Sequence, residues 1–167
     1  MNRKSEVLNS CSVFVEGLGF ISNTATVSLP TIAFENFEAK SGVATHTVTS
    51  TVLQKMEAEF ELNEVNHVYF QAIAKRQNEK AVFWVKKSTN INQSDKQITV
   101  TLKGKVDSFE FPSGEIGAEE KAKLTLQVDF FKYEQNGVVE VLVDIDNMVC
   151  EIAGTDIWAA QREFLLG

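Results

Sequence analysis

Two alternating apolar segments separated by Asn136-Gly137 constrain the fold of this chain more than any other feature. Asn-Gly is typical of a two-residue type I′ turn, because both central residues of that turn need a positive φ. The pattern predicts a long β-hairpin within 123–150, which continues into a short C-terminal helix that ends near Leu166.

The two-residue turn also fixes which residues of the hairpin face each other. Each facing pair on one side of the hairpin is apolar, as a single buried face requires. The same register places Asp129 opposite Asp144 on the solvent-facing side. The predicted apolar pairs are Phe130–Val143, Val128–Ile145 and Leu124–Val149.

The length and composition fit one globular domain that spans residues 1–167. A chain of 167 residues can bury most of its apolar side chains in one core, and its 44% hydrophobic content is ordinary. Two prolines and nine glycines leave no flexible linker. The formal net charge of −7 argues against binding to nucleic acid phosphates and to anionic membranes.

No apolar segment approaches the roughly 20 residues that a membrane-spanning helix needs, so we expect no membrane insertion. The basic N-terminus is not followed by an apolar segment, which predicts no signal peptide and synthesis in the cytoplasm. Cys11 and Cys150 cannot form a disulfide framework. Both are expected as buried free thiols, unless the strand order brings them together.

The rest of the chain predicts further strands joined mostly by turns. Residues 7–16 form a first strand, and residues 24–37 form a second strand that is interrupted at Pro30. Leu53–Leu62 alternates apolar and acidic side chains, whereas the solvent-facing side of 97–109 is basic. Residues 81–87 are a strand, and residues 89–96 are expected as a turn.

Two helices are predicted. An apolar stripe at helical spacing begins at Val65, with Asn63 as the candidate N-cap and with Lys75 and Arg76 at the C-terminal end. The C-terminal helix is expected to begin after Thr155 as N-cap. The fold class is therefore mainly β with one or two helices (α+β), an antiparallel β-sandwich or barrel with a flanking amphipathic helix.

The polar segment at about 38–52 has no apolar face, so we expect a protruding loop or an extended hairpin tip. The C-terminal segment differs from this polar segment, because it has more large apolar side chains than one terminal turn usually buries. These side chains either dock on the core or pack on a neighbouring subunit. They are Ile157, Trp158, Phe164, Leu165 and Leu166.

The sequence contains no motif that indicates catalysis or a cofactor. His46 and His67 have no metal-ligand spacing, and no nucleophile–base pair or phosphate-binding loop occurs. Asp129, Asp144 and Asp146 are expected to lie close together. Such a cluster could bind a hard cation, but a solvent-facing acidic patch is the simpler interpretation. We therefore predict no catalytic residue, no metal and no cofactor.

Several short motifs, taken together and in order, resemble the major tail tube protein of contractile-tailed bacteriophages, and R-type bacteriocin tubes are similar. The resemblance covers nearly the whole chain. Its motifs are Leu29-Pro30, Glu35-Asn36-Phe37, Gly104-Lys105, Gly114 with Gly117, Ile145-Asp146-Asn147-Met148, Gly154-Thr155-Asp156, Arg162 and Leu166-Gly167. Family members often carry a run of glycines in the polar loop, where this chain has Gly42 alone.

The resemblance implies a structural subunit that forms hexameric rings, which stack into a hollow tube for DNA. It implies a location in the virion tail, with a sheath, a baseplate, a tail terminator and a tape measure protein as partners. The segment 40–51 would be an assembly arm. The candidate subunit and ring contacts are Lys40, Ser41, Gly42, Val43, His46, Asn147, Met148, Trp158, Phe164 and Leu165. The candidate lumen or acidic-face residues are Glu57, Glu59, Glu61, Asp129, Asp144 and Asp146.

Three alternatives stay open at the level of the sequence. The chain could form the tube of an R-type bacteriocin or of another contractile injection system. It could be a monomeric β-barrel that binds a small ligand, which would need a large apolar cavity. A hydrolase is the weakest alternative, because no nucleophile–base pair can be named.

Overall fold

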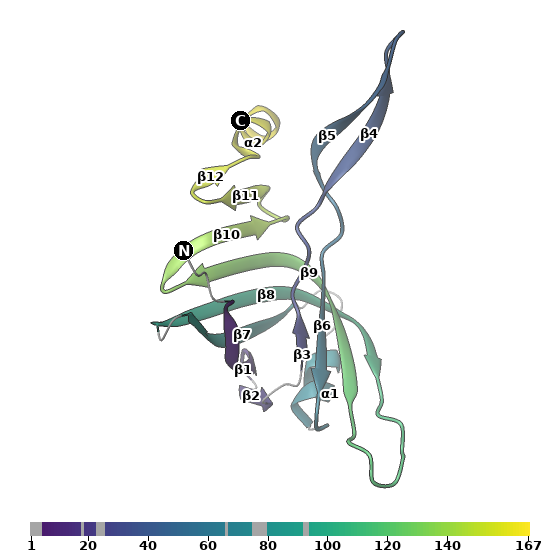
Figure 1. Cartoon of the computed structure of the whole chain (residues 1–167), viewed down its shortest axis with the longest axis vertical. Helices are drawn as coiled ribbons and strands as arrows, with labels where there is room; N and C mark the ends of the chain where they lie inside the picture. Colours follow the sequence, from purple (N-terminus) through teal and green to yellow (C-terminus); the bar gives the residue numbers. More distant parts are fainter. Residues whose placement is uncertain (1–4, 18, 23–25, 66, 75–79, 92–93) are drawn as a thin grey trace.

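The structure is a computed structural model that describes residues 5–17, 19–22, 26–65, 67–74, 80–91 and 94–167. Most of the strands form one antiparallel sheet, which runs in the order β12-β11-β10-β9-β8-β7-β1-β2 (Figure 1). A second pair, β3 and β6, joins this sheet through β9. The strands of the large sheet are β1 Val7–Val15, β2 Gly19–Ser22, β3 Thr26–Ser28, β6 Glu57–Leu62, β7 Ala81–Ile91, β8 Ser94–Glu110, β9 Ala122–Gln135, β10 Val138–Asp144, β11 Val149–Ile152 and β12 Thr155–Asp156.

The long strand β9 changes partner along its length. Residues 122–127 pair with β6, whereas residues 130–135 pair with β10 on the same side of the strand. On its other side β9 pairs with β8 from end to end. β9 is therefore shared by two half-sheets, one that contains β3 and β6 and one that contains β10, β11 and β12.

The junction of the two half-sheets requires a glycine in β8. The register of β8 against β9 shifts between Lys103 and Gly104. A Cβ atom built on Gly104 would lie 1.8 Å from the backbone oxygen of Gln127, a distance that no side chain can tolerate. Gly104 thus permits a close approach of the two backbones where the sheet bends.

The inward faces of the curled sheet form one core. Phe60 of β6 stacks on Phe83 of β7, with the ring centroids 5.4 Å apart. The predicted alternation in Leu53–Leu62 is confirmed, because the even-numbered side chains from Met56 to Leu62 are buried. Other fully buried side chains are Val13, Val15, Val85, Val100, Leu102, Leu124, Leu126 and Val143.

The polar segment folds as a separate two-stranded hairpin that projects from the end of the molecule (Figure 1). It consists of β4 Phe34–Lys40 and β5 Thr45–Leu53. The turn is closed by the backbone N–H of Ser41, which donates to the Ala44 carbonyl at 2.8 Å. The prediction of an extended hairpin tip is confirmed for this segment.

The predicted register of the hairpin at Asn136-Gly137 is wrong beyond its first two pairs. Val138 faces Gln135 as expected, but a bulge after Val139 then moves the register by one residue. Val143 consequently faces Phe131, and Asp144 faces Phe130 rather than Asp129. The pairs expected for Val128 and Leu124 do not form, because β10 ends at Asp144 and the first half of β9 pairs with β6.

Two further segments predicted from the sequence also differ. The expected strand at 24–37 is divided around Pro30 into β3 and β4, which lie in different sheets. The residues expected as a turn at 89–96 mostly extend β7 to Ile91 and begin β8 at Ser94. Thr89 faces Lys96 and Asn90 faces Asp95, so the two strands continue to pair within the segment that was expected to turn.

Both helices begin later in the chain than predicted. Helix α1 spans His67–Ala74, so Asn63 lies too far ahead of it to be the N-cap. Lys75 and Arg76 lie outside the described residues. Helix α2 spans Ala159–Leu166 and has Trp158 at its N-cap, because Thr155 is taken up by the short strand β12. Neither described helix has the length and the apolar character to cross a membrane.

Candidate assembly surfaces

The β4–β5 hairpin exposes almost every side chain it carries. Val43 at its tip is 97% exposed, and His46 on β5 faces Ala39 across the hairpin. Large apolar side chains on its strands are also about half exposed, among them Phe37 at 54% and Val48 at 44%, which face each other across the hairpin. The predicted contacts Lys40, Ser41, Gly42, Val43 and His46 all lie at or beside this tip.

The base of the hairpin is fixed to the C-terminal segment by two side-chain hydrogen bonds. The indole Nε1 of Trp158 donates to the carbonyl of Thr51 at 2.8 Å. The amide of Gln161 donates to the Oγ1 of the same threonine at 2.7 Å. The hairpin and α2 are therefore held in one arrangement, although they are separated by about a hundred residues in sequence.

A mainly apolar groove of about 350 Å³ lies at this junction. One wall is the base of β5, the second wall is the turn between β10 and β11, and the third wall is the start of α2. We call it the end groove. Its lining residues are Thr51, Val52, Leu53, Ile145, Met148, Trp158 and Gln161.

The sequence left two alternatives for the C-terminal apolar residues, docking on the core or packing on a neighbouring subunit, and the structure divides the residues into two groups. Ile157 and Trp158 pack against the core. Helix α2 itself has no buried residue, and Phe164, Leu165 and Leu166 are 88%, 64% and 70% exposed. The last turn of α2 is therefore an unpartnered apolar surface beside the end groove.

An ion pair anchors α2 to the β11–β12 segment. Arg162 contacts the Asp156 carboxylate at 2.7 Å and also donates to the carbonyl of Met148 at 2.9 Å. The Arg162 guanidinium holds the pKa of Asp156 below its usual range. The left-handed conformation of Met148, with φ 53°, is thus fixed from outside by a side chain of the helix.

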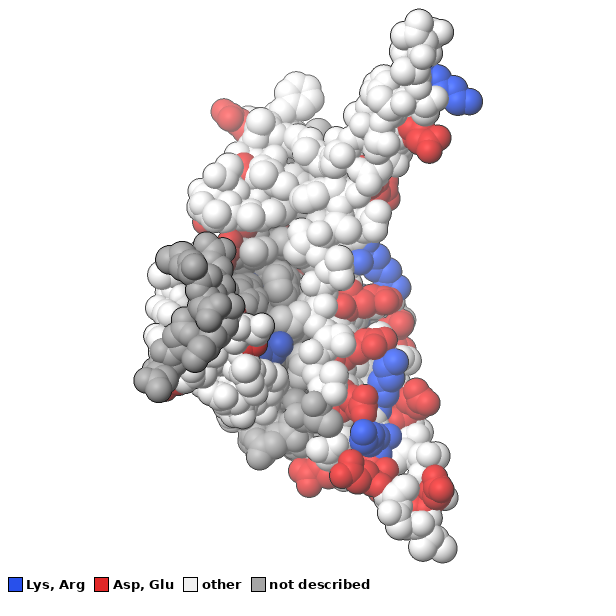
Figure 2. Space-filling view, viewed as in Figure 1, with Lys and Arg blue, Asp and Glu red and all other residues white. Residues whose placement is uncertain are grey.

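The outer face of β6, β9 and β8 carries charges of both signs (Figure 2). Glu57, Glu59 and Glu61 project from β6 as expected. Each of them is paired with a lysine, at 2.6 Å from Lys55, 3.4 Å from Lys123 and 3.3 Å from Lys121 respectively. The sequence pattern of β6 alone indicated an acidic face, but the lysines on and beside β9 largely neutralise it.

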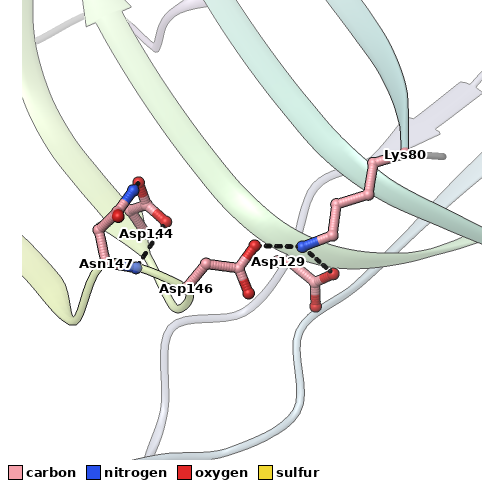
Figure 3. Close-up of polar contacts among 5 residues, drawn as sticks. All are labelled: Lys80, Asp129, Asp144, Asp146 and Asn147. Atoms are coloured by element: carbon pink, nitrogen blue, oxygen red, sulfur yellow. Dashed lines mark hydrogen bonds and ion pairs between the residues drawn. The ribbon is translucent and has the colours of Figure 1, made fainter. Parts of the chain in front are cut away.

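Asp129 and Asp146 do not form a carboxylate cluster, because Lys80 lies between them (Figure 3). The Nζ of Lys80 is 3.0 Å from Asp129 and also contacts Asp146. Asp146 raises the pKa of Lys80, and Lys80 in turn lowers the pKa of Asp146. No pattern in the sequence indicated Lys80, since it comes from the start of a distant strand.

Asp144 has a different role from its neighbours. Its carboxylate accepts hydrogen bonds from the backbone and the side-chain amide of Asn147, at 3.2 Å and 2.6 Å. These bonds close the tight turn between β10 and β11 (Figure 3). Asn147 is therefore a turn residue, and Met148 next to it lines the end groove.

The histidines and cysteines do not converge. His67 is exposed at the start of α1, far along the chain from His46. Cys150 is buried and Cys11 is partly buried; neither forms a disulfide, and their strands stand at separated positions in the sheet. Within the described ranges, no three histidine, cysteine or acidic side chains are placed to hold a metal ion.

Comparison with protein families gives a match over residues 5–165 to the phage tail tube protein FII family. The chain belongs to this family. It is a structural subunit of a tail tube, a component of the phage tail. Comparison with curated protein sequences finds no significant match.

Two solved structures share the fold of this tail tube protein, and both come from an extracellular contractile injection system, PVC. The first is the sheath/tube terminator in its extended state, with a TM-score of 0.55 and 16% identity over 75% of this chain and 93% of that one. The second is from the sheath–tube complex in its extended state, with a TM-score of 0.56 and 15% identity over 75% of this chain and 88% of that one. The predicted fold class is confirmed.

Proposed function

We propose that this tail tube subunit forms closed hexameric rings, which stack into the hollow inner tube of a contractile phage tail and give DNA its path. The observation that carries the proposal is a half-sheet with two open edges. In the part of the chain that the structure describes, β3 pairs only with β6, and residues 105–110 of β8 pair only with β9. Unpaired strand edges favour pairing with another chain.

Ring formation would bring these two different edges together. One edge of each subunit would meet the other edge of its neighbour, which makes the contact heterologous. A heterologous contact that closes gives a ring, and no subunit then keeps an open edge. The outer face of the same half-sheet, with Glu57, Glu59 and Glu61, becomes the candidate wall of the lumen.

A lumen wall of this kind suits the passage of DNA. Lys121 and Lys123 on this face are paired with Glu61 and Glu59, so these two lysines offer a phosphate little unopposed positive charge. The net charge of −7 adds a general repulsion. Asp129 and Asp146 belong to a separate ion-pair network around Lys80 and are proposed as contributors to the subunit surface.

The β4–β5 hairpin is the proposed assembly arm. It is exposed on all sides in the monomer, and Trp158 and Gln161 fix its direction. The contacts proposed for the arm and for α2 lie at one end of the molecule (Figure 1). A sheath, a baseplate, a tail terminator and a tape measure protein are the other proposed partners, and the subunit is proposed to be non-catalytic and to assemble in the host cytoplasm.

Negative-stain microscopy of the concentrated protein tests this function. Wild-type protein is expected to give rings or tubes. Replacing residues 39–46 by Asn-Gly retains the Glu38–Thr47 pair and the anchor at Thr51, so that this variant is expected to fold with an unchanged melting temperature. It should nevertheless fail to form tubes. A wild-type protein that stays monomeric at every concentration would contradict the proposal.

The same tube could serve in another contractile injection system, and the shared fold with the extracellular injection-system structures is the observation that favours this second candidate. The difference lies in what the particle carries. Detection of DNA or of protein cargo inside isolated particles would distinguish the two.

A further inference from the structure

Apolar side chains are exposed both in the end groove, at the base of the β4–β5 hairpin, and in a loop at the other end of the long axis of the molecule. This loop comprises residues 111–121 between β8 and β9, at the far end from the hairpin (Figure 1). Ile116 in this loop is 106% exposed, and Phe111 at its base is 69% exposed. An apolar side chain so fully exposed has no packing role in the monomer.

The loop holds Ile116 in a defined position. The N–H of Ala118 donates to the carbonyl of Glu115 at 3.3 Å, and Gly117 has φ 86°. This is the pattern of a type II turn with Ile116 at its first central position, where glycine supplies the positive φ that follows. The turn therefore presents the isoleucine at the tip of the loop.

Aromatic contacts support the base of the same loop. Phe111 packs edge-on against Phe109, with the ring centroids 5.0 Å apart, and stacks on Phe70 of α1 at 6.2 Å. Phe109 and Phe70 are themselves 5.7 Å apart. A loop that is ordered before binding loses less conformational entropy when it docks.

The end groove has matching properties. Its volume of about 350 Å³ is enough for a large aliphatic side chain and part of its turn. Its walls are apolar apart from Thr51 and Gln161, whose polar atoms are engaged with each other. The groove is thus formed without a partner.

We propose that the Ile116 loop of one subunit docks into the end groove of a second copy of this chain in the next ring. A knob and a groove at opposite ends of one molecule cannot meet within it, but they meet when copies repeat along its long axis. Such a heterologous contact does not close on itself and generates a stack. The proposal rests on the proposed tube function and assigns its ring-to-ring contact.

The first test is Ile116→Asp, in the full-length chain. The exposed position predicts an unchanged melting temperature and intact rings. Tubes should be lost, with a drop of roughly tenfold or more in ring-to-ring association, since burial of one large apolar side chain is worth at least one factor of ten. Val138→Asp, at a site that is 59% exposed and outside both surfaces, is the control and should form normal tubes.

The second test is oxidative cross-linking of the double variant Ile116→Cys, Ile145→Cys. Assembled tubes should give a ladder of covalent multimers on a denaturing gel, whereas isolated rings should not. Each single variant controls for Cys11 and Cys150 and should stay monomeric. The pair Ile116→Cys, Val138→Cys should give no ladder.

The outcomes separate this inference from the function on which it rests. The inference is wrong if Ile116→Asp forms tubes like the wild type. It is also wrong if the cross-linked ladder is absent, or appears with the Val138→Cys pair instead. In these cases the groove has another occupant, and the tube function stands. A ladder from isolated rings would place the contact within a ring and also overturn it. If the wild type forms neither rings nor tubes, the tube function itself fails.

Discussion

The pair β8–β9 and the hairpin β4–β5 are both long antiparallel ribbons, but they differ in what holds them. β8 and β9 bury alternate side chains in the core, including Leu102, Leu124 and Leu126. β4 and β5 bury no side chain fully and contact the rest of the molecule mainly near their base, through Phe34, Thr51 and Leu53. The first ribbon is stabilised within the monomer, and we propose that the second gains its packing from another chain.

The largest expected difference comes from truncating one phenylalanine in each region. Phe83→Ala removes a fully buried ring that stacks on Phe60 and should lower the free energy of unfolding by about 3–5 kcal/mol. Phe37→Ala, at a site 54% exposed on the hairpin, should change it by less than about 0.5 kcal/mol. Urea unfolding measures both, and equal effects would remove the distinction between the regions.

A pair of glycine substitutions sharpens the same contrast. Gly104→Ala forces a Cβ atom against the Gln127 backbone and should cost about 1–3 kcal/mol. Gly42→Ala at the hairpin turn meets no atom within 4 Å and should be close to neutral. Thermal unfolding of the two variants tests this, and a stable Gly104→Ala protein would show that β8 and β9 can separate at the bend.

Trp158→Phe addresses the anchor between the hairpin and the body. It removes the indole N–H that donates to Thr51 and should weaken protection of β5 against hydrogen exchange by about 1 kcal/mol. Trp84→Phe on β7 is the control, with no effect on β5 exchange. Unchanged protection in Trp158→Phe would mean that the hairpin is ordered without this anchor.

The smallest expected effect is the change in the free energy of unfolding at low pH. The pKa values of Asp146 and Asp156 are lowered by Lys80 and Arg162. A lowered folded pKa contributes stability above the unfolded value of about 3.9, and this stability is lost as the pH falls through the folded pKa. The free energy of unfolding should therefore decline from about pH 5 downward.

Lys80→Met should reduce the slope of this decline, because it removes the partner of Asp146. The hairpin truncated at 39–46 should keep the wild-type slope, since the pairs lie in the body of the protein. Chemical unfolding at several pH values measures both slopes. An unchanged slope in Lys80→Met would show that the pair adds no stability.

Local patterns in the sequence correctly predicted the parts of the fold that local chemistry determines. The alternation in Leu53–Leu62 identified the buried face of β6, and the absence of an apolar face in 38–52 identified the projecting segment. Asn136-Gly137 located its turn correctly. The turn did not determine the strand register farther from it. A bulge after Val139 adds one residue to β10, and the turn residues do not predict this bulge.

The contacts missed from the sequence are those between distant segments. Lys80 reaches Asp129 and Asp146, and Trp158 reaches Thr51, across separations that no periodicity reports. The end groove is likewise assembled from three segments. Trp158 and Met148, which line it, were nevertheless among the candidate contacts. Trp158 belongs to the large apolar groups that stand out near the terminus, and Met148 belongs to a motif that resembles the tail tube family.

The pairing of the shared strand β9 also indicates the order in which the strand pairs form during folding. Its pairing with β8 and β10 joins neighbouring segments of the chain, whereas its pairing with β6 and that of β1 with β7 close long loops. Long-range pairing of this kind slows folding to milliseconds or seconds in proteins of this class. We expect the local hairpins to form first and the β6–β9 edge to close late. A newly made subunit would then gain its ring-forming edge only when the rest of the sheet is complete.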